Sequence, residues 1–210
     1  MVGLAGAALG PLVFEHAAIR VDALLAPAEA SPTLWYVTRA SAMAAYLTLS
    51  LSVMLGMLRT VARQSHERLS WVVDELHQVI ATLAMLLVGV HLTTLVLDPF
   101  LPFSVANVLV PLSEPYRPLA VQIGVGAFYT MALVAASSWI RRRIRYQLWR
   151  GIHYLSLVAF ALATAHGLLA GSDTGEPWMR AVYAAAAAAV AFLTLVRVFA
   201  GAPSTSQQKA

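Results

Sequence analysis

Cysteine is absent from this chain of 210 residues. Its absence excludes disulfide bonds, thiolate metal sites and iron–sulfur clusters held by the protein's own sulfur atoms. Charged residues are scarce too, because Asp, Glu, Lys and Arg make up only 11% of the sequence, against about 25% in typical soluble domains. Any redox or metal chemistry must therefore use other ligands, and the composition argues against a water-soluble fold.

Apolar residues dominate what is present. They make up 60% of the chain, and its mean hydropathy is +0.72. A soluble fold of this length has too little volume for its surface to bury so many apolar side chains, whereas a bilayer accepts them if helices or a closed barrel satisfy the backbone. The apolar runs are continuous, and barrel strands would alternate. We therefore predict an all-α transmembrane helix bundle, with membrane lipid around it and no nucleic-acid partner.

Five segments are long and apolar enough to cross a membrane, since a spanning helix needs about 20 residues. They are residues 34–58, 72–97, 119–140, 152–170 and 178–199. Together they predict a membrane domain over residues 34–200. The N-terminal segment 1–33 is apolar but interrupted by Pro11, so we expect an interfacial or possible sixth helix there. The polar tail 201–210 is expected to be disordered and cytoplasmic.

Arginine is distributed unevenly among the links between these segments. Two links contain the runs Arg59, Arg63, Arg68 and Arg141, Arg142, Arg143, Arg145, Arg150. The positive-inside rule places both links in the cytoplasm, which predicts a multi-pass protein, expected in a bacterial cytoplasmic membrane. Tryptophan prefers the membrane interface, and all five tryptophans lie at predicted helix ends. They are Trp35, Trp71, Trp139, Trp149 and Trp178.

Four of the six histidines lie inside predicted spans, and they fall into two pairs by depth. His77 and His91 lie on the second span, while His153 and His166 lie on the fourth, which runs in the same direction. The two histidines of each span are about 20 Å apart along the helix. Intramembrane histidines need an interior partner. Two opposed imidazoles at each level, without a nearby thiolate or carboxylate, predict two bis-histidine haems, bound noncovalently.

These spacings also resemble a known family. A pair fourteen residues apart, followed by a pair thirteen apart on a later helix, is similar to the ferric reductase-like transmembrane domain. Ferric reductases, NADPH oxidases and the haem subunit of the bacterial methionine sulfoxide reductase system share that domain. The segments LHQVIATLAMLLVGVHL and WRGIHYLSLVAFALATAHGLLAGSD resemble its ligand helices, and WYVTRASAMAAYLTLSLSVMLG resembles its opening helix.

The resemblance covers approximately residues 35–199 and assigns roles to the histidines. It implies that His77 and His153 ligate an inner haem b, and that His91 and His166 ligate an outer one. Large members continue into flavin- and NADPH-binding domains, whereas this sequence stops at Ala210. We therefore expect a stand-alone member whose electron donor is a separate molecule.

Other residues are secondary candidates. Arg39 lies one turn inside the first span, where a haem propionate would suit its charge, although snorkelling to the interface explains it equally well. Arg117 is a weaker candidate of the same kind. The arginine run at 141–145 fits an acidic cytoplasmic flavoprotein, but membrane topology alone accounts for it. His16 and His66 are expected to be solvated, and Tyr116 and Tyr154 are expected to be interface or packing residues.

The predicted function is transmembrane electron transfer by an oxidoreductase component. Electrons would pass from a cytoplasmic flavoprotein or other reductant, through two haems b, to an external acceptor. One alternative is a quinone-linked membrane cytochrome b that takes electrons from quinol. Another is a transporter for a metal ion or haem that uses the same histidines, and a third is a purely structural subunit.

Overall fold

The computed structural model describes residues 32–65, 67–99, 103–110 and 117–200, and gives side chains for these except 60–65, 67–69 and 200. The predicted N-terminal segment and C-terminal tail, and with them His16, His66 and Tyr116, lie outside the described residues. The described part is all-α, as predicted. Its elements are α2 Thr33–Ser65, α3 Glu67–Leu97, α4 Val105–Leu109, α5 Pro118–Trp139, α6 Tyr146–Ala170, the 3₁₀ helix η1 Ser172–Gly175, and α7 Pro177–Ala200.

Five of these helices are long and apolar enough to cross a membrane. They correspond to the five predicted spans, so the chain is an integral multi-pass membrane protein. Their ends differ from the predicted ones because backbone hydrogen bonding continues beyond the apolar core of a helix. The clearest case is α6, which begins at Tyr146 instead of 152 and so places Trp149 and Arg150 inside the helix. Similarly, α2 and α3 extend into the predicted link at 59–71.

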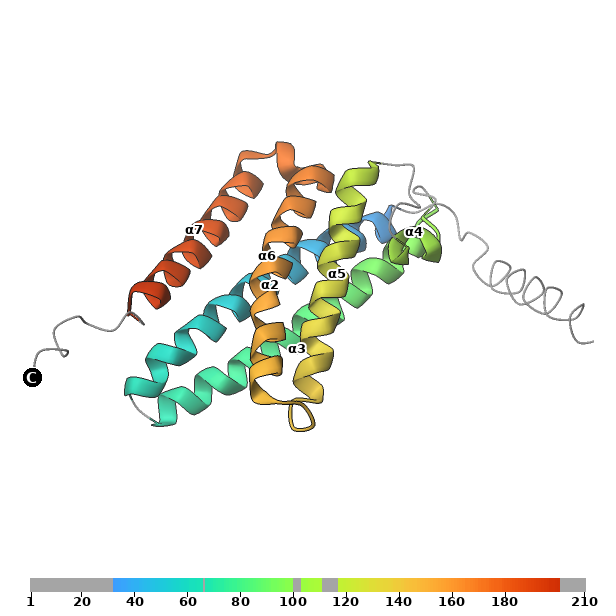
Figure 1. Ribbon diagram of the computed structural model, residues 1–210. Coiled ribbons are helices and arrows are strands. Elements are labelled where there is room, and N and C mark those ends of the chain that lie inside the picture. The colour runs from blue at the N-terminus through green and yellow to red at the C-terminus, as the bar shows by residue number, and fades with distance from the viewer. Residues whose placement is uncertain (1–31, 66, 100–102, 111–116, 201–210) are drawn as a thin grey trace, which may run out of the picture.

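The helices form two hairpins and a covering helix (Figure 1). One hairpin is α2–α3, the other is α5–α6, and α7 packs against α2. The α2–α3 hairpin runs obliquely to α5 and α6 in Figure 1. We call the end with the α5–α6 turn, residues 140–145, the arginine end, and the opposite end the η1 end. The short helix α4 lies near the η1 end, where the Tyr129 hydroxyl of α5 donates to its Leu109 carbonyl (2.7 Å).

Helix α2 occupies the centre of the bundle. Its buried residues Tyr46, Leu49 and Val53 contact buried side chains of α6 and α7, including Phe160 and Tyr183. The Tyr46 ring stacks on Phe160 with centroids 5.9 Å apart, and it lies 4.8 Å from Tyr183. On α6, Phe160 lies between His153 and His166 in the sequence. The aromatic core therefore occupies the part of the bundle between the two histidine levels.

Helices α3 and α6 do not pack against each other. No Cα atom of α3 lies within 8 Å of a Cα atom of α6, although each contacts other helices of the bundle. The four intramembrane histidines all belong to these two helices. The backbones of these two helices therefore stand apart, and we call the space between them, which side chains enter, the α3–α6 gap.

Candidate functional site

His77 and His153 meet across this gap toward the arginine end. Their ring centroids are 6.0 Å apart and the rings are inclined at 74°. Two imidazoles that bind one metal ion from opposite sides have ring centres roughly 6 Å apart, because each metal–nitrogen bond is about 2 Å long. The structure therefore brings the first predicted pair together at a separation that suits a shared metal ion.

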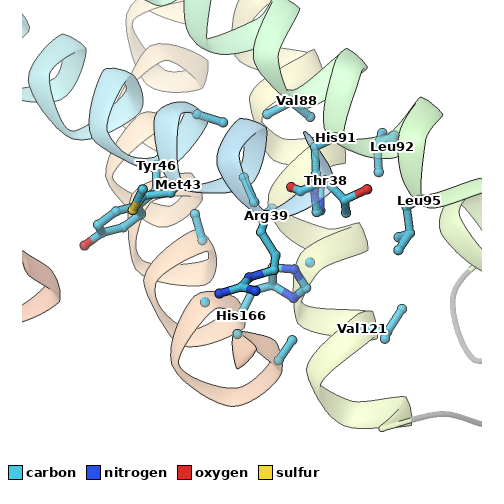
Figure 2. Close-up of a pocket in the computed structure, with 18 of the residues that line it drawn as sticks. Thr38, Arg39, Met43, Tyr46, Val88, His91, Leu92, Leu95, Val121 and His166 are labelled. Carbon is cyan, nitrogen blue, oxygen red and sulfur yellow. The ribbon is translucent and has the colours of Figure 1, made fainter. Parts of the chain in front are cut away.

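His91 and His166 line one cavity of about 300 Å³ toward the η1 end (Figure 2). All five long helices contribute to its wall, together with Phe103 and Val108 from the α4 region. Most of the lining side chains are apolar, and the volume lies at the lower limit of typical small-molecule sites. The second predicted pair thus faces a shared interior space that is large enough for a ligand.

Three of the four histidines are held by a backbone carbonyl on a neighbouring helix. The Nδ1 atoms of His77, His91 and His166 lie 2.9, 3.1 and 2.8 Å from the carbonyl oxygens of Ser52, Thr38 and Ala120, respectively. A carbonyl can only accept, so each Nδ1 carries the proton and donates it. Each neutral ring then has the lone pair of Nε2 available for a metal. Metal-ligating histidines are commonly oriented in this way.

His153 is held differently. Its Nδ1 atom is buried and has no hydrogen-bond partner among the described residues. Instead, the indole of Trp149 stacks on the imidazole, with centroids 5.1 Å apart and planes inclined at 27°. The ring therefore lies between Trp149 and His77, and packing fixes its orientation.

Two glycines make room for histidine rings. A Cβ atom at Gly124 of α5 would lie 2.6 Å from Cε1 and Nδ1 of His166, and one at Gly56 of α2 would lie 3.3 Å from Cε1 of His77. Glycine costs about 1 kcal/mol relative to alanine inside a helix, so its presence in a span calls for a local reason. The close approach of the two rings supplies that reason, which the sequence alone left unidentified.

Two histidines alone would not complete a metal site at either level. Among the residues that the structure describes, no group of three or more His, Cys, Asp or Glu could hold a metal ion. A metal site built from protein alone commonly takes four ligands. Two opposed histidines instead suit iron whose remaining ligands come from a flat macrocycle. The ring separation of His77 and His153 and the cavity between His91 and His166 are both compatible with such a group, which each pair would hold from two sides.

A family model described as a domain of unknown function, DUF8596, matches residues 33–173. The chain belongs to this family. No curated protein and no solved structure matches the chain. The DUF8596 range includes all four intramembrane histidines, both glycines and the three residues whose carbonyls orient the rings. It also begins at the first residue of α2 and ends at Asp173 in η1.

Arg39 forms an ion pair with Asp173 of η1 at the edge of the cavity. Its Nε donates to one carboxylate oxygen (3.1 Å), and its Nη2 contacts the other. Arg39 also lies over the Trp35 ring, with its guanidinium carbon 5.8 Å from the ring centroid. Asp173 was not among the predicted site residues, although Arg39 was expected to have an anionic partner. A role for Arg39 toward a propionate stays a prediction.

A second Arg–Asp pair lies near the arginine end. Arg59 of α2 binds both carboxylate oxygens of Asp74, one of them at 2.9 Å. Asp74 precedes His77 by about one helical turn on α3. Each histidine level therefore has an α2 arginine and an aspartate beside it. Arg117 also lines the η1-end cavity and donates to the Leu169 carbonyl (3.1 Å).

Proposed function

We propose that this protein carries electrons across a membrane through two b-type haems, each bound between one histidine of α3 and one of α6. The observation that carries the proposal is the pairing of the histidines across the α3–α6 gap. The ring centroids of His77 and His153 are 6.0 Å apart, and His91 and His166 line the same cavity. In three of the four rings, a carbonyl bond at Nδ1 leaves Nε2 available for iron.

When bound, haem would supply one-electron redox chemistry. The chain's own residues would orient the ligands, exclude water and hold the two levels at a fixed separation. The carbonyls of Thr38, Ser52 and Ala120 accept from Nδ1, which would leave Nε2 of three imidazoles to face the iron. Two histidines per iron leave no open coordination position, so the arrangement suits electron transfer better than the binding of oxygen or another small ligand.

The direction of transfer and the partners extend the proposal. By its resemblance to the ferric reductase-like transmembrane domain, the protein would accept electrons from a cytoplasmic reductant at the arginine end. It would deliver them to an external acceptor at the η1 end. The exposed arginines at 141–143 support a cytoplasmic position for that end under the positive-inside rule.

The alternatives predict different behaviour. A transporter commonly has broken helices near the membrane midplane, whereas α3 and α6 are continuous through their histidines. This continuity favours a fixed cofactor over a transported one. A quinone-linked cytochrome would bind the same haems but take its electrons from lipid-soluble quinol, so the choice of donor separates the two redox functions.

Purified protein from haem-replete cells tests the proposal directly. A pyridine haemochrome assay should give about two noncovalent haems b per chain, since each histidine pair holds one iron. A colourless preparation would refute the proposal. A ratio near one would refute it for one of the two levels, and single His→Ala variants would identify which.

A further inference from the structure

An aromatic chain leads from the surface at the arginine end to His153. Tyr146, Trp149 and His153 follow one another at spacings of three and four residues, which places them on one face of α6. The Tyr146 and Trp149 ring centroids are 5.7 Å apart, and those of Trp149 and His153 are 5.1 Å apart. Tyr146 is 65% exposed. A continuous path of π systems therefore joins the exterior to one of the candidate iron ligands.

Trp149 is fixed in this path. Its indole Nε1 donates to the Ser138 hydroxyl of α5 (3.4 Å), while one ring face covers the imidazole. His153 also differs from the other three histidines because no carbonyl among the described residues accepts from its Nδ1. The position beside this imidazole is thus occupied by a half-buried indole.

The surface around the outer end of the path is strongly basic. Its exposed arginines come from the α5–α6 turn and the first turns of α6: Arg141, Arg142, Arg143, Arg145 and Arg150. We call these five residues the arginine face. A cluster of one sign attracts a partner of the opposite sign and raises its association rate. The arginine face therefore complements a protein with an acidic surface.

We propose that electrons enter the protein through Trp149, from a reduced flavoprotein whose acidic surface docks on the arginine face. This inference rests on the proposed haem function. Each transfer would move one electron from the donor's flavin, which is oxidised, to the haem that His77 and His153 would hold, which is reduced. No covalent bond to the chain forms or breaks, and any proton released by the flavin passes to the cytoplasmic water.

Stopped-flow reduction of the full-length, haem-loaded protein tests the entry path. The probe is a small acidic FMN protein, flavodoxin in its fully reduced form, and dithionite serves as a small-molecule reductant. Trp149→Leu should slow reduction by flavodoxin several-fold while dithionite still reduces all the haem. The control is Trp139→Leu, because Trp139 lies near the same end but is 88% exposed, and this variant should match the wild type.

Haem content and the ferric electron paramagnetic resonance spectrum separate entry from positioning. Both should stay unchanged in Tyr146→Leu, because Tyr146 is exposed, and this variant should still slow reduction by flavodoxin. Trp149→Leu also removes the ring that packs on His153, so its reduction rate is compared per haem retained. Wild-type rates in every variant that retains haem would overturn the entry path. A wild-type protein without haem would instead refute the proposed function.

Binding measured without turnover tests the docking surface. Replacing Arg141, Arg142, Arg143 and Arg145 by Gln should weaken flavodoxin binding by roughly tenfold or more at low salt, with a smaller difference at high salt. The control is Arg180→Gln, an exposed arginine near the η1 end, which should leave binding unchanged. Equal affinities of the wild type and the fourfold variant would overturn docking and leave membrane topology as the sole role of these arginines.

Discussion

Replacing Gly124 by alanine adds one methyl carbon beside His166, in one of the two candidate haem sites. The new Cβ atom would lie 2.6 Å from Cε1 and Nδ1 of His166, whereas ordinary contacts begin at 3.4 Å. The ring must retreat by about 0.8 Å, the difference between these two distances. Overpacking of this kind costs about 1–3 kcal/mol. Only the part of this cost that the ring avoids in the haem-free protein falls on binding, so haem affinity at the His91–His166 level should fall by no more than roughly 150-fold.

The retreat also disturbs the orientation of the ring. Nδ1 of His166 donates to the Ala120 carbonyl at 2.8 Å, and such a bond contributes about 0.5–1.5 kcal/mol. The clash involves only protein atoms, so it should lower the thermal stability of the haem-free protein as well. Haem titration and thermal unfolding in detergent, each with and without haem, measure the two effects separately.

Gly126→Ala is the matched control for Gly124→Ala. Gly126 lies two residues further along α5, and a Cβ atom there would meet Leu162 at an ordinary 3.8 Å. This variant should keep both haems and its stability, because alanine is also the better helix former. If Gly124→Ala matched Gly126→Ala in haem affinity and in melting temperature, the placement of His166 against α5 would be wrong.

Three further predictions address the pairing, the ion pair and the orientation. Alanine variants of His77 and His153 should lose the same haem, and each should be nearly as damaging as the double variant, because one iron needs both ligands; additive effects in haem titrations would contradict a shared iron. Arg39→Gln and Asp173→Asn should couple by no more than about 1 kcal/mol in unfolding, because both side chains are about one-third exposed; a larger coupling would indicate a desolvated pair. Arg143→Cys and Ser172→Cys should be labelled from opposite sides of the membrane in intact cells, and equal labelling would refute the proposed orientation.

The fold was predictable because a bilayer allows so few solutions. Apolar length alone locates five spans, and the structure contains a helix at each. Helix ends were less predictable, as α6 shows. Polar residues such as Arg145 and Gln147 mark the end of the apolar run, yet nothing in 146–151 prevents helical hydrogen bonding. The resulting extension matters, because it brings Trp149 into the helix and onto the His153 ring.

The contacts of His77 and His91 with α2 follow from the register of a helical hairpin. The carbonyls that orient His77 and His91 belong to Ser52 and Thr38, which are fourteen residues apart like the histidines themselves. In an antiparallel pair of helices, equal steps in opposite directions return to equivalent positions, so one contact repeats at both levels. The sequence shows the spacing of fourteen on α3, but the register becomes known only once both helices are placed. The sequence alone therefore could not identify Ser52 and Thr38 as the carbonyl acceptors.

The step of thirteen on α6 explains why its two histidines are held differently. At about 100° per residue, a step of fourteen returns to within about 40° of the same face, whereas a step of thirteen ends about 140° away. Both histidines of α3 therefore reach carbonyls of α2, but only one histidine of α6 can reach α5. His166 does so through Ala120, while His153 faces His77 and is covered by Trp149 of its own helix. The oblique arrangement of the hairpins still lets His153 face His77 and lets His166 share a cavity with His91. His153 therefore has no carbonyl partner among the described residues. Its ring instead stacks on Trp149, which continues the aromatic chain from the exposed Tyr146.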